Sequence, residues 1–356
     1  MAKVLGVVST PYHLLVFLFV RDAFLSGDEV DLIVTDKTPY MEEVYQSGRL
    51  QPYFHRVSFA DGRKIKNPYK SAPVTFWESF VHNGTTDAIL DAPLPRYDRM
   101  YFASPGTPDE IVKEIAKTLI KKNKGITFHR YEDGFASYTK KPVHVISTPS
   151  GTAMYKALWH YDIAEKEKEI LLFEPRMAEN NVDFEKVQIP RTPERIERII
   201  AMAKDIFRFH AAVPPQNVIF LGQGTENGSQ NPETYQRLIR KLRDIAGAEN
   251  FAIKPHPRGV HDNFHGELTV YEDSCPFELA VASGAMEDKT LVSFYSTACV
   301  SGKLLFQSKC RIIFLYPLAE DSFNEKCDYE DYFHAFSELC DNVYIARSWE
   351  DVEKLL

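Results

Sequence analysis

Short apolar runs alternate with amphipathic stretches along most of the chain. Residues 3–9 (KVLGVVS) form a β-branched run, and Pro11 then opens a helical pattern that Gly27 ends. Residues 109–122 place aliphatic side chains at helical spacing among lysines. Further strands are predicted at residues 30–35, 54–59, 99–103 and 126–130. This alternation predicts a mostly parallel sheet with helices on both faces.

The composition changes near Pro190, where a basic and apolar helix is predicted over residues 192–210. The alternation then restarts, with strands predicted at residues 217–221, 251–254, 268–270, 291–294, 311–316 and 343–346. Helices are expected at residues 233–245, 277–281, 298–306 and after residue 348. We therefore expect an α/β protein with two doubly wound Rossmann-like lobes facing a cleft. Their predicted bounds are an N-terminal domain at 1–190, a linker helix at 191–216 and a C-terminal domain at 217–356.

Composition narrows the function classes. A length of 356 residues suits two domains. The 42 basic and 50 acidic residues give a net charge of −8, which argues against nucleic-acid binding because phosphates require a basic footprint. The five cysteines show neither a CxxC pair nor metal-site spacing, which favours a cytoplasmic location. The longest apolar run, residues 14–20, is too short to span a membrane.

Two polar segments follow strands in the first half. Ser9, Thr10 and Pro11 follow the first strand, where they form either a helix cap or a hydroxyl-lined lip of the cleft. Glu132 and Asp133 follow the fifth strand, and a glycine comes next, so that one acid can turn into the cleft as a general base. A capped turn is the structural alternative for these two acids.

Polar segments also follow strands in the second half. His256 stands between two prolines and is flanked by Lys254 and Arg258, so the segment suits an anionic phosphate. Glu278 lies at a predicted helix start, where it either stabilises the helix dipole or accepts hydrogen bonds from a ribose diol. The hydroxyls of Ser296 and Thr297 begin another helix, and helix N-termini bind phosphate. Together these residues predict a nucleotide site.

The ordered set YEDG, KxHP, PFE and ST resembles the bacterial sialyltransferases of the GT-B fold. The opening TPYHLL and the chain length are most similar to the family 52 lipooligosaccharide sialyltransferases. The resemblance implies an inverting, metal-independent glycosyltransferase that moves sialic acid from CMP-sialic acid to a galactose-terminated glycan such as lipooligosaccharide. It implies no cofactor beyond this donor. The N-terminal domain would take the acceptor and the C-terminal domain the CMP-sugar.

The same resemblance assigns roles to individual residues. It implies that Asp133, of the pair with Glu132, is the base that deprotonates the acceptor, and that His256 is the general acid at the CMP phosphate. Glu226 is a rival base in the loop after the strand at 217–221. The donor-binding residues that we expect are Lys254, Pro257, Arg258, Glu278, Ser296, Thr297, Gly222 and Gln223.

Alternative functions remain open at this point. They are a transferase for another CMP-activated acid sugar, a polysialyltransferase and, in another reaction class, a nucleotide-sugar epimerase of GT-B shape. A basic patch at Arg63, Lys64, Lys66 and Lys70 is either a solvated loop or a peripheral contact with the inner face of the cytoplasmic membrane. That contact would suit a lipid-linked acceptor. A homodimer is compatible with the sequence.

Overall fold

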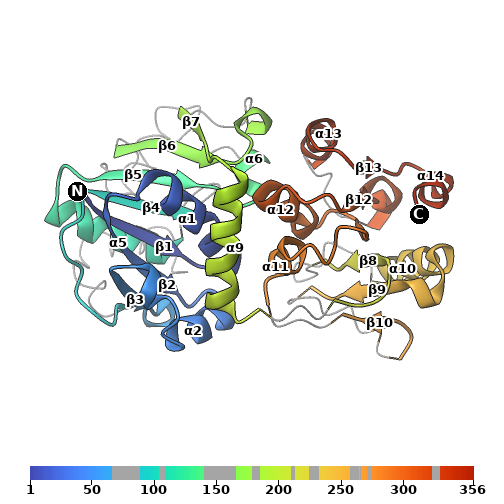
Figure 1. Cartoon of the computed structure of the whole chain (residues 1–356), viewed down its shortest axis with the longest axis horizontal. Coiled ribbons are helices and arrows are strands. Elements are labelled where there is room, and N and C mark those ends of the chain that lie inside the picture. The colour runs from blue at the N-terminus through green and yellow to red at the C-terminus, as the bar shows by residue number, and fades with distance from the viewer. Residues whose placement is uncertain are drawn as a thin grey trace, which may run out of the picture. The chain divides into compact units, whose positions relative to one another are not determined.

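The computed structural model divides into two compact units, Met1–Phe207 and Arg208–Leu356. It describes residues 1–65, 89–103, 109–139, 166–178, 185–209, 213–223, 232–256, 264, 266–271, 275–322 and 329–356. Each unit contains one parallel sheet with helices packed on it (Figure 1). The sequence prediction of two Rossmann-like α/β domains is confirmed.

The first unit is built on a seven-stranded sheet in the order β3-β2-β1-β4-β5-β6-β7. Its strands are β1 (Lys3–Val8), β2 (Glu29–Thr35), β3 (Arg56–Ala60), β4 (Arg99–Ala103), β5 (Thr127–Tyr131), β6 (Glu167–Leu172) and β7 (Glu185–Gln188). Every neighbouring pair is parallel. The predicted strands of this half are present, and β6 and β7 extend the sheet beyond them.

Helices cover this sheet, and one of them approaches it closely. The helices are α1 (Pro11–Phe24), α2 (Pro39–Gln46), α5 (Glu110–Lys122), α6 (Ala136–Thr139) and α9 (Pro193–Phe207), with short 3-10 turns η1 (Gln51–Tyr53), η2 (Gly62–Lys64) and η3 (Pro175–Ala178). A Cβ at Gly6 would lie 2.2 Å from the Phe17 ring. Glycine in β1 therefore allows α1 to pack directly on the strand.

Helix α9, which the sequence analysis assigned to a linker, lies against α1. Arg195 Nε is 2.7 Å and Arg198 Nη2 is 2.8 Å from Asp22 Oδ2. These two ion pairs lower the pKa of the Asp22 carboxyl, mainly through its hydrogen bond with Arg198. The first compact unit accordingly includes α9 and ends at Phe207.

The second unit has a six-stranded sheet in the order β10-β9-β8-β11-β12-β13, again with parallel pairs throughout. Its strands are β8 (Val218–Leu221), β9 (Phe251–Lys254), β10 (Thr269–Val270), β11 (Thr290–Ser293), β12 (Arg311–Phe314) and β13 (Val343–Ile345). Its helices are α10 (Pro232–Ala246), α11 (Phe277–Ala282), α12 (Thr297–Phe306), α13 (Tyr329–Leu339) and α14 (Trp349–Leu355), with 3-10 turns η4 (Ala248–Asn250) and η5 (Tyr316–Ser322).

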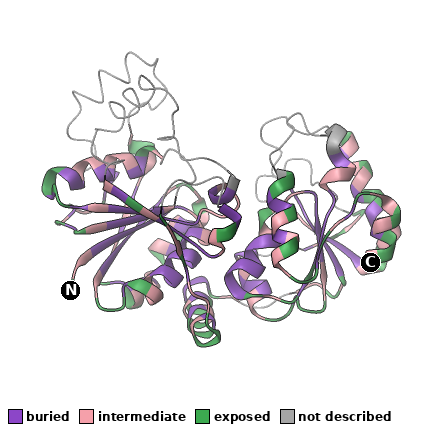
Figure 2. Cartoon of the chain, turned by 90° about the horizontal axis from the view of Figure 1, so that it is seen from above, coloured by how far each residue is buried: buried purple, intermediate pink, exposed green. Residues whose placement is uncertain are grey.

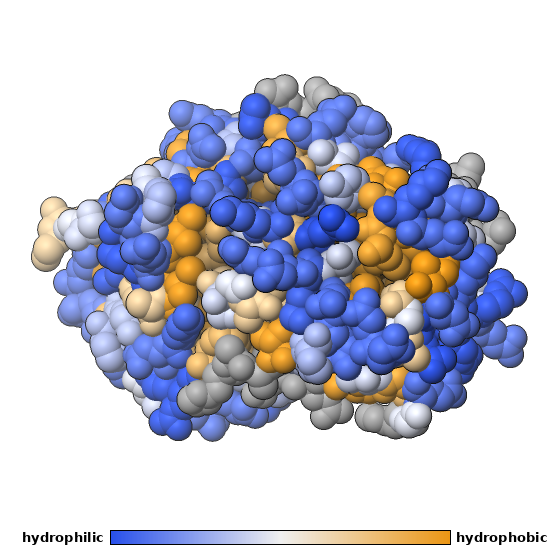
Figure 3. Space-filling model, turned by 45° about the vertical axis from the view of Figure 1, so that its right-hand side comes forward, coloured by the Kyte–Doolittle hydropathy of each residue, from blue (hydrophilic) through white to orange (hydrophobic). Residues whose placement is uncertain are grey.

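Both sheets bury their strands and expose polar residues on the surrounding helices. Figure 2 shows buried residues concentrated along the central strands of each unit. On the face in Figure 3, hydrophilic residues predominate and apolar side chains gather in separate patches. Within the described ranges, no helix combines the length and apolar character needed to cross a bilayer.

Because neighbouring strands are parallel, their carboxyl ends lie at one edge of the sheet in each unit. Both sheets change direction next to their first strand, between β1 and β4 and between β8 and β11. In open α/β sheets, ligands bind beyond the carboxyl ends of the strands near such a change. The segments after β1, β5, β8, β9 and β11 are therefore where functional side chains are expected.

Candidate functional site

In the first unit, Glu132 follows β5 and is completely buried. Its carboxylate accepts hydrogen bonds from the Tyr12 hydroxyl at 2.6 Å, from the Tyr138 hydroxyl, and from the Phe173 backbone N–H at 2.9 Å. Burial raises the pKa of this carboxyl, while the three donors and the charge of Arg191 oppose the shift. Glu132 thus ties α1, the α6 segment and the end of β6 together.

Asp133, the next residue, is partly exposed and has other hydrogen-bond partners than Glu132. Its side chain keeps 23% of its surface exposed, and its Oδ1 contacts Nε2 of His13. Its backbone N–H donates to Ser137 Oγ at 2.7 Å. Gly134, with a φ of +71°, turns the chain after it, a conformation that glycine adopts without strain. Of the two adjacent acids, Asp133 is therefore the one that is partly exposed to solvent.

The segment after β1 forms both a cap and a wall of this site. Thr10 caps α1, since its Oγ1 accepts from the His13 N–H at 3.1 Å, and Pro11 occupies the first turn. Ser9 is buried, and its N–H donates to His13 Nδ1 at 3.3 Å. The helix-cap interpretation is confirmed. The same cap holds the His13 ring against Asp133, which brings together the two segments predicted in this half.

In the second unit, Lys254 and Glu278 lie near each other. Lys254 Nζ is 4.9 Å from the centroid of the Tyr271 ring and 5.9 Å from that of Phe277. Ser301 Oγ on α12 lies 2.9 Å from Glu278 Oε1 on α11. Surrounding protein raises the pKa of the Glu278 carboxyl, although Ser301 and the Lys254 charge both lower it. The Lys254 ammonium group, the Glu278 carboxyl and the rings of Tyr271 and Phe277 therefore lie close together.

Close packing of two helices brings Glu278 to Ser301. A Cβ at Gly302 would lie 2.6 Å from Val281 Cγ1. Because this distance is shorter than real Cβ contacts, only glycine lets α12 approach α11 so closely. The spacing between Glu278 and Ser301 depends on this approach.

Ser296 and Thr297 begin α12 directly after β11. Ser296 is the N-cap, and its Oγ accepts from the Ala298 N–H at 3.4 Å. Thr297 is exposed. The Ser296 N–H in turn donates to Ser293 Oγ at 3.0 Å, which fixes the start of the helix on the strand. The predicted hydroxyl pair is therefore at a helix N-terminus, as an anion site requires.

Gln223 joins the ends of β8 and β11. Its Nε2 donates to Ser293 Oγ at 2.6 Å, and its backbone N–H donates to the Tyr235 hydroxyl at 3.2 Å. Gly222, just before it, is buried and hydrogen-bonded to the Lys254 carbonyl at 2.9 Å. These two predicted donor-binding residues are therefore part of the scaffold under the strand ends.

The predicted donor residues lie at or after the carboxyl ends of β10, β9, β8 and β11, four strands that are neighbours in the sheet in this order. His256 lies two residues beyond β9 and is partly buried. Pro257, Arg258 and the rival base Glu226 lie outside the described residues. The described candidates of the second half thus share one edge of one sheet.

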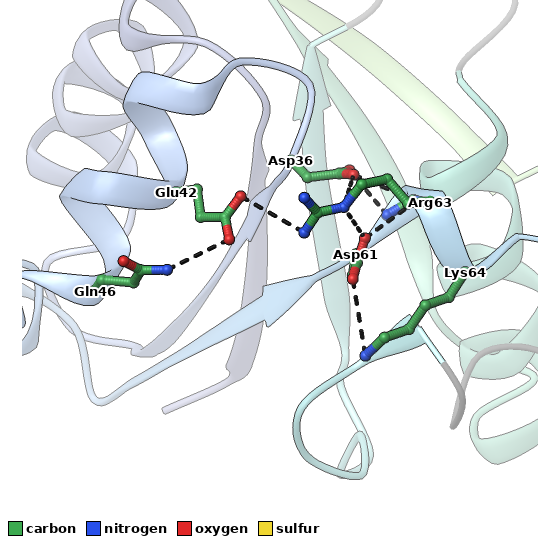
Figure 4. A network of polar contacts seen from close by, with 7 residues as sticks. Asp36, Glu42, Gln46, Asp61, Arg63 and Lys64 are labelled. Carbon is green, nitrogen blue, oxygen red and sulfur yellow. Dashed lines mark hydrogen bonds and ion pairs between the residues drawn. The ribbon is translucent and has the colours of Figure 1, made fainter.

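The predicted basic patch is largely neutralised where the structure describes it. Arg63 Nε is 2.7 Å from Asp61 Oδ1 and 3.5 Å from Asp36 Oδ2, and its Nη2 is 3.6 Å from Glu42 Oε2 (Figure 4). Lys64 Nζ is 3.9 Å from Asp61 Oδ2. Lys66 and Lys70 lie outside the described residues. The described half of the patch offers an anionic surface little net positive charge.

Among the described residues, one group could supply metal ligands: Glu29, Asp31 and His55. It lies at the amino ends of β2 and β3, the opposite edge of the sheet from Asp133. Lys3 forms an ion pair with Glu29 and lies 3.9 Å from Asp31, while the Tyr97 hydroxyl donates to Asp31 at 2.6 Å. The two carboxylates therefore already interact with the Lys3 ammonium group and the Tyr97 hydroxyl.

Sequence reasoning missed three residues of these sites. His13 entered the sequence analysis only as a letter of the TPYHLL motif, and Tyr271 and Ser301 were not singled out. His13 stands four residues after Ser9, a spacing that returns a helical side chain to the cap. That spacing is a usable signal for His13. Tyr271 and Ser301 depend on the tertiary packing of β10, α11 and α12.

More than half of the chain matches the model of a known protein family. The model of the alpha-2,8-polysialyltransferase (POLYST) family matches residues 96–312. The matched segment contains Asp133, His256, Glu278 and the Ser296-Thr297 pair. No curated protein matches the sequence significantly. The narrower resemblance to family 52 stays a prediction.

Solved structures share the fold at low sequence identity. Spinosyn rhamnosyltransferase SpnG is 12% identical, with a TM-score of 0.52 over 100% of this chain and 88% of its own. Arabidopsis thaliana UGT89C1 complexed with UDP is 12% identical, with a TM-score of 0.51 over 100% and 89%. The Methanocaldococcus jannaschii UDP-GlcNAc 2-epimerase is 11% identical, with a TM-score of 0.51 over 99% and 91%. The chain has the GT-B fold that these proteins share.

Proposed function

Because this chain belongs to the alpha-2,8-polysialyltransferase family and is thus a sialyltransferase-type glycosyltransferase, we propose that it transfers sialic acid from CMP-sialic acid to a glycan hydroxyl. The family match carries this proposal, because it spans the proposed base, acid and donor residues. The structural neighbours include both transferases and epimerases, so the fold alone does not separate the two reactions. The match with a transferase family favours transfer over epimerisation.

The second unit supports the donor half of the proposal. A helix N-terminus with the hydroxyls of Ser296 and Thr297 suits the CMP phosphate. Glu278 is a hydrogen-bond acceptor for the ribose diol, and the rings of Tyr271 and Phe277 beside Lys254 offer flat surfaces near it. Pro257 and Arg258 remain proposed donor contacts. Gly222 and Gln223 contribute indirectly, because their hydrogen bonds to Lys254 and Ser293 hold the ends of β8, β9 and β11 together.

The first unit supports the proposed base. Asp133 takes the proton of the acceptor hydroxyl, whose oxygen then bonds to the anomeric carbon of sialic acid. The bond from that carbon to the phosphate oxygen breaks on the opposite side, so the anomeric centre inverts. His256 stabilises or protonates the departing CMP phosphate. The Asp133 carboxylate can accept the proton that the acceptor loses, and the His256 imidazole can donate one to the phosphate. We therefore propose that transfer is metal-independent.

There are two candidate acceptors for the transferred sialic acid. The resemblance in the sequence suggests a galactose-terminated glycan such as lipooligosaccharide, whereas the description of the matching family supports a sialic acid terminus extended through its 8-hydroxyl. A related CMP-activated acid sugar is the alternative donor. We propose that the acceptor bears a terminal sialic acid, because the family match is the stronger observation.

One assay tests donor and acceptor together. The protein is incubated with CMP-sialic acid and either a galactose-terminated or a sialic acid-terminated oligosaccharide, and products are identified by mass. Repeated addition to the sialylated acceptor is the expected result. Addition to galactose alone would support the lipooligosaccharide alternative, and no transfer to either would contradict the proposal.

Nucleotide preference gives an independent measurement. At 100 times its Kd a ligand stabilises the fold by about 2.7 kcal/mol, so CMP should raise the melting temperature at concentrations where UDP does not. A shift with UDP alone would instead favour the epimerase-like alternative. This measurement does not depend on knowing the acceptor.

A further inference from the structure

His13 places its Nε2 atom against the Asp133 carboxylate. The residue is 3% exposed, and its ring lies edge-on to Tyr131, with the ring centroids 6.3 Å apart. Its Nδ1 faces the backbone N–H of Ser9 at 3.3 Å, and its Nε2 faces Oδ1 of Asp133. The ring therefore stands between a backbone donor and a carboxylate.

These two contacts define the tautomer. The Ser9 N–H can only donate, so His13 Nδ1 must be the unprotonated acceptor. The neutral ring then carries its hydrogen on Nε2 and donates it to Asp133. An imidazole held in this way both aims the carboxylate and favours its ionised form.

Other charged or titratable groups around the pair are engaged in contacts of their own. The Tyr131 hydroxyl donates to the Val7 carbonyl at 2.6 Å, and burial raises the pKa of Tyr131. Tyr12 and Tyr138 both donate to Glu132, on which the Arg191 charge also acts. His13 Nε2 faces the Asp133 carboxylate directly.

From this geometry we infer that His13 is a positioning residue for catalysis: it holds Asp133 ionised and aimed at the acceptor hydroxyl. The inference rests on the proposed transfer reaction. During transfer the acceptor proton moves to the Asp133 carboxylate, the acceptor oxygen bonds to the anomeric carbon, and CMP leaves. In this scheme His13 does not exchange a proton with the substrate; it only keeps its Nε2 contact with Asp133.

Matched substitutions separate positioning from packing. His13→Gln keeps an N–H donor at about the place of Nε2, whereas His13→Met fills a similar volume without a donor. We expect His13→Met to lower kcat by about 10–100-fold, as misplacement of a reacting group does. His13→Gln should stay within about threefold of wild type, because its side-chain amide keeps the same donor geometry.

The pH profile supplies a readout that packing alone does not move. Without the donor the carboxylate is stabilised less, so the rising acid limb of kcat/KM should move to higher pH in His13→Met and return in His13→Gln. Tyr12→Phe, which removes a neighbouring hydrogen bond to Glu132, should lower the melting temperature without moving this limb. Equal profiles for the Met and Gln variants would overturn the inference.

Two further measurements separate this inference from the proposed function. In the free protein, nitrogen NMR should show His13 as the Nε2–H tautomer, and the carboxyl carbon of Asp133 should titrate at higher pH in His13→Met than in wild type. A hydrogen on Nδ1, or unchanged titration, overturns the inference even if the enzyme is active. A wild-type protein that transfers nothing from CMP-sialic acid overturns the proposed function, and the catalytic role of His13 with it.

Discussion

The strand-end residues of the two units are held in contrasting ways. In the first unit, Glu132 and Asp133 accept hydrogen bonds from tyrosine hydroxyls, a backbone N–H and the His13 ring. In the second unit, Lys254 lies over aromatic rings, and Thr297 stands exposed at the start of α12. The first set is mutually bonded within the protein, whereas the second, in which Glu278 is also bonded to Ser301, presents a helix terminus and ring faces.

This difference matches the two tasks in the proposed reaction. A base must already point at its proton when the substrate arrives, because small misplacements cost large factors in rate. A donor site instead has to exchange water for a phosphate and a ribose, so it benefits from helix N–H groups and hydroxyls that solvent can reach. The chemical step should therefore be sensitive to substitution in the first unit, and donor affinity to substitution in the second.

The largest effect is expected at Asp133. Asp133→Asn should lower the transfer rate by about 10²–10⁴-fold, the usual contribution of a general base, with CMP affinity close to that of wild type. Steady-state kinetics with calorimetry of CMP binding checks both. Glu226→Gln is the control for the rival base and should cost far less. The reverse ranking would place the base in the loop after β8.

Substitution of His256 tests the one residue of the second unit that we assign to chemistry. His256→Ala should lower turnover by about 10²–10³-fold, the loss typical when a group that stabilises developing charge is removed. Because an imidazole acid loses its proton as pH rises, the falling alkaline limb should disappear with it. His334→Ala, at an exposed histidine of α13, is the matched control and should leave both unchanged. An alkaline limb that survives in His256→Ala would limit His256 to a rigid loop element.

A smaller effect, confined to binding, is expected at Glu278. A charge-assisted hydrogen bond is worth about 1.5–3 kcal/mol, so Glu278→Ala should weaken CMP binding by about 10–100-fold. The measurement is calorimetric titration with CMP, and Glu287→Ala, at an exposed acid just after α11, is the control. Unchanged affinity in Glu278→Ala would remove this residue from the donor site and end the contrast between the units.

The sequence predicted the fold through its hydrophobic periodicity. The runs at residues 3–9, 30–35 and 99–103 became adjacent strands because each is apolar on both faces, as a covered parallel sheet demands. Strand β7 was missed because Glu185–Gln188 is a polar edge strand, with two of its four residues exposed and none buried. Periodicity cannot identify a strand that does not enter the core.

For the sites, the sequence predicted which segments follow strands but not what each side chain contacts. Glu132 and Asp133 are chemically similar neighbours, yet one is buried under tyrosines from α1 and α6 while the other meets His13. That distinction depends on packing between residues about 120 positions apart. Likewise, Ser301 reaches Glu278 only because Gly302 lets α12 approach α11.

The smallest expected effect concerns stability and separates Glu132 from its neighbour. Burial raises the folded-state pKa of Glu132 above its ordinary value of 4.5, so folding favours the protonated acid. The stabilisation is fully present below the unfolded pKa and is lost as pH rises through the folded pKa. Wild-type unfolding free energy should therefore fall over that window more steeply than that of Glu132→Gln, which cannot ionise. Urea unfolding at a series of pH values measures the two slopes, and Glu287→Gln serves as an exposed control. Parallel curves for wild type and Glu132→Gln would show that burial does not govern this acid, and the proposed division between a structural Glu132 and a reactive Asp133 would lose its electrostatic basis.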